Sequence, residues 1–193
     1  MRVLGRLLRH EARVLGSVAA WGLRRTPRGG PGRFGYARGQ GAMAFGLGFV
    51  CLVETVMMAL LLRRWPVAHG LVLGLDLYAL LSVAGMYAAA VTHPHLLDAG
   101  TLRLRRAVHA DVRIPLAHIA SVRRELRTSQ RPGDGALELA VGAQTSVTLE
   151  LAEPVTHVSL LGRPRTVTVV RCHADDPDGL VRAVGAAARH AVP

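Results

Sequence analysis

The chain has 193 residues, half of them hydrophobic and only 19% charged, with a mean hydropathy of +0.28. This balance is too apolar for a typical water-soluble globular protein, so membrane segments must be sought first. The two cysteines, Cys51 and Cys172, lie far apart in unlike surroundings and imply no disulfide framework.

The formal net charge of +11 is not by itself evidence for a nucleic-acid partner, because every basic residue is an arginine. Lysine and asparagine are absent, which is typical of GC-rich codon choice, so part of the basicity reflects mutational bias. Residues 1–41 carry nine arginines and one acid, residues 42–97 are neutral, and residues 98–193 carry a net charge of +3. Charge placed just before an apolar run favours an anionic membrane surface as partner over nucleic acid.

Residues 1–21 are predicted to form an amphipathic helix. Four arginines fall on one stripe and apolar residues cover the opposite face, as in a helix that lies in the membrane interface. The alternative is a helix that packs on the chain's own soluble domain. Six residues are candidates for binding the membrane surface: Arg2, Arg6, Arg9, Arg13, Arg24 and Arg25.

Residues 22–41 are predicted to be a linker, since they hold seven glycines, two prolines and five arginines without periodicity. A phosphate-binding loop is disfavoured because no strand precedes the glycines and the required lysine is missing. An RNA-binding Arg-Gly segment is equally weak, because its motif occurs once without repetition.

Residues 42–97 are predicted to form a transmembrane hairpin, with spans at 42–62 and 67–91. The first run has 21 residues, about 31 Å of helix, which matches the thickness of a hydrocarbon core. Two arginines, Trp65 and Pro66 separate the spans, and so short a connection requires antiparallel helices. Trp21, Trp65 and Tyr87 are expected to be interfacial anchors.

Arginine placement predicts the orientation. Five arginines precede the first span and three closely follow the second, whereas the connecting turn holds two. With two spans, both termini share a side, which the positive-inside rule makes cytoplasmic.

Two acids, Glu54 and Asp76, interrupt the spans at matching depths, roughly 12–14 Å from the turn. A charged acid there costs about 2.5–3.5 kcal/mol on insertion scales, so each is expected to face protein. The residues could form a proton or cation site between helices. Alternatively they hold helices together, with a protonated carboxyl bonded to its partner, Thr55, Tyr78 or backbone, across the hairpin or an oligomer interface.

After residue 98 the apolar period changes to two, which predicts short strands around 102–105, 112–116, 137–141, 147–151 and 165–171. A helix over 177–190 is predicted to end the chain, with Asp176 as N-cap and Pro177 at its first position. Leu180, Val181 and Val184 give that helix its apolar face. The expected fold is α+β: the hairpin, then a small antiparallel barrel or sandwich over 98–193 closed by the helix.

The stretch Gly100-Thr-Leu-Arg-Leu-Arg, followed by Ile114-Pro115-Leu116, Ile119 and Val122, resembles the opening of bacterial pleckstrin-homology-like domains. Members of that family often carry such a domain after two transmembrane helices. The whole chain also resembles small integral membrane proteins of high-GC bacteria. The resemblance implies a fold and a plasma-membrane location, and it transfers no catalytic residues. Arg103, Arg105 and Arg113 lie on the strands where eukaryotic relatives bind phosphoinositides, but the basic loop signature of those relatives is not recognisable.

The sequence gives no reason to expect an enzyme or a cofactor, because no nucleophile elbow, paired cysteine motif or carboxylate pair is found in the soluble domain. His93 and His95 could hold a metal, but no ligand cluster accompanies them and Pro94 explains the kink. We therefore expect a membrane scaffold or regulatory protein whose soluble domain binds a protein partner or the membrane surface. Its partners would be anionic lipid and a second copy or another membrane protein. A subunit of a proton- or ion-linked transporter is the alternative.

Overall fold

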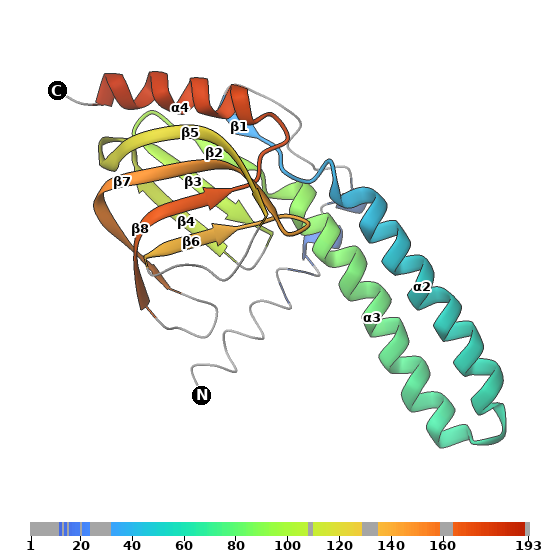
Figure 1. Cartoon of the computed structure of the whole chain (residues 1–193). Helices are drawn as coiled ribbons and strands as arrows, with labels where there is room; N and C mark the ends of the chain where they lie inside the picture. The colour runs from blue at the N-terminus through green and yellow to red at the C-terminus, as the bar shows by residue number, and fades with distance from the viewer. Residues whose placement is uncertain are drawn as a thin grey trace.

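The computed structural model describes residues 12, 14, 16–19, 21–23, 32–107, 110–128, 135–158 and 164–191. Two long antiparallel helices extend away from a body made of two β-sheets and a terminal helix (Figure 1). Helix α2 is Gln40–Leu61, the 3-10 turn η1 is Leu62–Arg64, and helix α3 is Pro66–Thr92. The predicted α+β class with two long apolar helices is confirmed.

The turn between the helices follows from four residues. Arg63 and Arg64 end the apolar run within η1, and the Trp65 N–H donates to the Leu62 carbonyl at 2.9 Å. Pro66 then occupies the first position of α3, where its missing N–H costs no helical hydrogen bond. The two helices are long and apolar enough to cross a membrane, and their apolar windows are only 6% and 0% buried.

The helices pack along a seam with the 3–4 spacing of antiparallel helix pairs. The less exposed positions of α2 recur in this way, and so do those of α3. On α2 they are Gly41, Ala44, Gly48, Cys51, Thr55 and Met58, and on α3 they include His69, Leu73, Asp76, Leu80, Val83 and Tyr87. Small residues dominate the α2 side, which allows the two backbones to approach closely.

Among the described residues, eight strands form two four-stranded sheets. The first has the order β1 (Arg33–Phe34), β2 (His95–Leu97), β3 (Thr101–Arg106) and β4 (Ala110–Pro115), all antiparallel. The second has the order β5 (Ile119–Thr128), β7 (Gln144–Val158), β8 (Pro164–Cys172) and β6 (Ala136–Leu139). A 3-10 turn η2 (Leu116–His118) connects the sheets between β4 and β5.

The expected sheet arrangement needs two corrections. Within the described residues the sheets do not join into a closed barrel, so of the two expected forms the barrel is wrong. Strand β6 pairs with β8 in parallel, with Ala136 opposite Val169, and the domain is therefore not wholly antiparallel. Alternating side chains predict which residues face the core, but they carry no information about the direction of the neighbouring strand.

The core lies between the sheets and is closed by helix α4 (Pro177–Ala191). Leu102, Leu104 and Ile114 enter it from the first sheet, and Val147 and Leu149 from the second. Leu180 and Val184 of α4 are fully buried in the same cluster. The Asp176 carboxylate accepts the Gly179 N–H at 2.9 Å, which confirms the predicted N-cap.

Residues 32–39 belong to the sheet body, although their composition predicts a linker. Arg33 and Phe34 form β1, which pairs with β2 immediately after α3. Gly32 has a φ of +78°, and a Cβ there would collide with the Leu97 carbonyl, so only glycine suits this turn. The chain thus passes over the sheet edge before it enters α2.

Candidate functional site: the helix hairpin and its junction with the sheets

The two hairpin acids differ in their exposure and in their position relative to the helix seam. Asp76 lies on the seam, with one carboxylate oxygen buried and without a hydrogen-bond partner in the described structure. Glu54 lies beside the seam and is exposed, and no hydrogen bond joins it to Asp76 among the described residues. The buried hydroxyl of Thr55 donates to its own helix, to the Cys51 carbonyl at 2.8 Å. The sequence predicted their common depth, but not the face on which each one lies.

Tyr78 stands apart from both acids. Its side chain is 52% exposed, and its backbone carbonyl accepts a hydrogen bond from Ser82 at 2.8 Å. The expected hydrogen bond between Asp76 and Tyr78 is therefore not formed within the described residues.

The candidate membrane-surface arginines Arg2, Arg6, Arg9, Arg13, Arg24 and Arg25 lie outside the described residues. Described residues of the same segment pack against α3. Val14 is only 5% exposed and clusters with Ala89 of α3, and the Trp21 and Tyr87 rings meet edge to face at 5.9 Å. A Cβ on Gly85 would collide with Val14. Part of the apolar face is thus covered by α3, and Ala107 just after β3 packs against the same cluster.

A buried pair, Tyr36 and His95, joins the hairpin to the sheets. The two rings stack with centroids 4.8 Å apart, and both side chains are 1% exposed. The Tyr36 hydroxyl accepts the Ala107 N–H at 2.6 Å. Burial raises the pKa of Tyr36 to about 12, so this phenol stays neutral.

Both ring nitrogens of His95 have backbone partners. Nδ1 accepts the Arg105 N–H at 3.1 Å, so the proton sits on Nε2, which donates to the His173 carbonyl at 2.9 Å. Burial lowers the pKa of His95 to about 4, and the imidazole is neutral at physiological pH. His95 therefore holds the junction together through its two hydrogen bonds, and neither ring nitrogen is free to bind a metal. His93 sits apart, against Thr92 and the Ala89 carbonyl.

Asp175 strengthens the same junction. Its carboxylate accepts the Arg38 N–H at 3.1 Å, and its own N–H donates to the Gly35 carbonyl at 2.8 Å. A Cβ on Gly35 would come within 2.8 Å of that carboxylate. The segment before α2 is thus held against the segment that leads into α4.

A cavity of about 440 Å³ lies where the hairpin meets the sheets. Its helical wall comes from α2 and α3, and its other wall from the end of β3, the β6–β7 turn and the segment after β8. The size falls in the range of small-molecule sites. A second cavity of about 450 Å³ lies at the same junction among the described residues, and its lining includes Trp21, Arg38 and Asp175.

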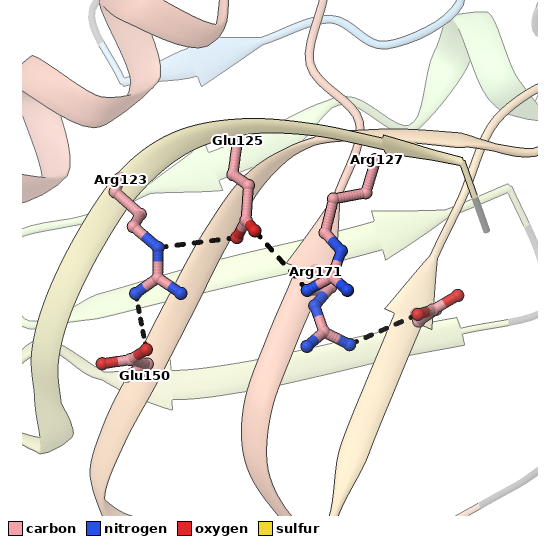
Figure 2. A network of polar contacts seen from close by, with 6 residues as sticks. Arg123, Glu125, Arg127, Glu150 and Arg171 are labelled. Atoms are coloured by element: carbon pink, nitrogen blue, oxygen red, sulfur yellow. Dashed lines mark hydrogen bonds and ion pairs between the residues drawn. The ribbon is translucent and has the colours of Figure 1, made fainter. Parts of the chain in front are cut away.

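Ion pairs cross the outer face of the second sheet (Figure 2). Arg123 lies between Glu150 and Glu125, Glu125 also contacts Arg127 at 3.5 Å, and Arg171 contacts Glu138 at 3.3 Å. The Arg171 and Glu138 side chains are only 17% and 12% exposed. Charges that are balanced pair by pair stabilise the sheet and keep its face soluble; they do not form a site for one ligand charge.

Sequence reasoning did not find Tyr36, and it considered His95 only as a metal ligand. The one local signal was an aromatic residue inside a glycine-rich stretch and a histidine at the end of a long apolar run. Their pairing depends on β1–β2 contact, which no periodicity predicts.

Comparisons with known proteins found no matching family model, no similar curated protein and no similar solved structure.

Proposed function

We propose that this chain is an integral membrane scaffold or regulatory protein. Helices α2 and α3 cross the bilayer as a hairpin, and the sheet domain binds a protein partner or the membrane surface. One observation carries the proposal: the apolar windows of two long helices are almost entirely uncovered, while the sheets bury a core of their own. Phe45, Val67 and Leu71 are each more than 70% exposed, which is unfavourable in water over so long a surface.

The positive-inside rule supports an orientation with both termini and the sheet domain in the cytoplasm of a bacterial cell. The pleckstrin-homology-like reading of the domain rests on the motif resemblance and is compatible with two sheets closed by a terminal helix. Anionic headgroups would then face the arginine-rich segment before α2.

Exposed Glu54 favours association with a second copy or another membrane protein. A carboxyl that faces lipid at this depth costs about 2.5–3.5 kcal/mol on insertion scales, and a partner helix that hydrogen-bonds it removes much of that cost. This is the physical reason to assign the hairpin a scaffolding role rather than that of a simple anchor.

The second candidate function is a subunit of a proton- or ion-linked transporter. It is favoured by the buried, unpartnered carboxylate oxygen of Asp76 in the seam. Two helices are too few to enclose a permeation path, so this role also requires an assembly.

Extraction and mass measurement test the proposal. The full chain should stay in the membrane fraction after alkaline carbonate treatment. Native mass spectrometry of complexes from native membranes should show multiples of the 20.6 kDa chain or an additional subunit. Release by carbonate, or only single chains at all concentrations, would contradict it.

A further inference from the structure

The junction cavity has two chemically different walls. Met43 and Leu47 of α2 and Val83 and Met86 of α3 make the helical wall apolar. Arg106 and His173 stand among the residues of the sheet wall. An occupant that satisfies both walls must itself be amphipathic.

Two polar groups of the sheet wall have no side-chain partner in the described part of the chain. No carboxylate pairs with Arg106 within the described residues, whereas Arg103 on the same strand is bound to Asp111. The Nδ1 atom of His173 is buried without a hydrogen-bond partner in the described structure. A guanidinium without a carboxylate partner among the described residues and a buried ring nitrogen on the same cavity wall favour an anionic group that can accept hydrogen bonds.

The apolar wall opens sideways onto the hairpin surface. Met43 is 67% exposed, Leu47 46% and Met86 45%, so the cavity merges with the outer face of the helices. These residues lie near the start of α2 and the end of α3, the level of the headgroups if the hairpin spans the bilayer. A molecule that diffuses within the membrane can therefore reach the cavity directly.

From these observations we propose that the cavity binds one anionic phospholipid of the surrounding bilayer. Its phosphate lies against Arg106 and His173, and its glycerol and upper acyl chain lie along Met43, Leu47, Val83 and Met86. The inference rests on the proposed membrane location and adds a specific ligand class. About 440 Å³ accommodates a headgroup and the first part of a chain, while the rest of the chain stays in the bilayer.

The test uses native mass spectrometry of the detergent-solubilised full chain. It is titrated with phosphatidylglycerol and phosphatidylcholine that carry the same acyl chains. One phosphatidylglycerol should be retained per chain under conditions that strip phosphatidylcholine. Arg106→Gln should weaken phosphatidylglycerol binding about tenfold, because it removes a charged hydrogen bond. It should also reduce the difference in affinity between phosphatidylglycerol and phosphatidylcholine. Arg182→Gln, at an exposed arginine of α4 outside the cavity, removes the same charge and should change neither value.

A second pair of variants tests the apolar wall. Leu47→Trp should reduce retention of both lipids by filling the cavity, whereas Leu60→Trp, equally on α2 but outside the cavity, should not. Equal binding of the two lipids, or equal effects of Arg106→Gln and Arg182→Gln, would overturn the proposal. Full competition by glycerol phosphate would also overturn it, because that result would indicate a soluble phosphate ligand. Detection of a bound polypeptide that Leu47→Trp displaces would overturn it as well. Carbonate extraction of the membranes from which each variant is purified separates the two proposals: loss of lipid selectivity in a chain that stays in the membrane refutes only the lipid site.

Discussion

At the scale of single residues, the junction depends on groups that are buried with their hydrogen bonds satisfied. His95 is the most informative, because its two ring nitrogens bridge β3 and the segment before α4 while Tyr36 covers its face. Only the neutral ring can accept the Arg105 N–H and donate to the His173 carbonyl together. Protonation would break this bridge and place a charge in the core.

Acid should therefore destabilise the sheet domain. Burial holds the pKa of folded His95 at about 4, against an ordinary value of 6.5, so between these values the unfolded chain binds a proton that the folded chain does not. Stability is complete above pH 6.5 and falls as the pH drops toward 4. Between pH 7 and pH 5 we expect a loss of about 2 kcal/mol in the free energy of unfolding, measured by urea denaturation of the detergent-solubilised chain. His95→Gln should remove most of this difference, and His190→Gln, at an exposed position near the end of α4, should leave it in place. An unchanged pH dependence in His95→Gln would contradict the assignment.

Glu54 is the residue whose exposure requires an external partner. Glu54→Gln should preserve assembly, because an amide still donates and accepts hydrogen bonds, whereas Glu54→Leu should weaken it. The transporter alternative predicts that Glu54→Gln abolishes activity and leaves assembly intact. Sedimentation of both variants in detergent measures the association. If Glu54→Leu and Asp76→Leu assemble like the parent chain, the acids do not hold helices together, and proton handling becomes the better account.

At the scale of elements, α4 closes the core through two fully buried side chains. Truncation of a buried leucine removes contacts and leaves a cavity. Leu180→Ala should lower the free energy of unfolding of the sheet domain by about 2–5 kcal/mol, measured by urea denaturation. Arg182→Ala, an exposed position on the same helix, is the control and should change it by less than about 0.5 kcal/mol. A similarly small loss for Leu180→Ala would mean that α4 does not contribute to the core.

The elements that the sequence predicted best are those set by local composition. The apolar runs predicted helices over 42–62 and 67–91, within two residues of α2 and α3 with their connecting turn. Asp176 and Pro177 predicted the start of α4 correctly. A long continuous apolar run and a helix cap are both features of residues adjacent in the sequence, so run length and cap signals detect them.

The elements and contacts that the sequence missed depend on distant partners. Strand β1 has two residues in a glycine-rich stretch and exists through pairing with β2, some sixty residues later. The parallel pairing of β6 with β8 and the Tyr36–His95 stack are of the same kind. The common depth of Glu54 and Asp76 stays a prediction from residue counting. The seam that partly buries Asp76 and leaves Glu54 exposed follows from packing between helices.

At the scale of the whole molecule, we propose that the hairpin crosses the bilayer and that the sheet domain lies on the cytoplasmic side. The native cysteines favour a labelling test, because burial raises the pKa of the Cys172 thiol to about 12 and leaves it unreactive. With Cys51 replaced by alanine, single cysteines can be placed at Trp65 in the turn and at Ala152, an exposed position on β7.

The most direct measurement is labelling of Trp65→Cys and Ala152→Cys in right-side-out spheroplasts with a maleimide that does not cross membranes. We expect the cysteine at position 65 to be labelled from outside, and the cysteine at position 152 to be labelled only after lysis. Labelling at position 152 in intact spheroplasts would contradict the orientation, and equal labelling of both positions before lysis would contradict the membrane hairpin itself.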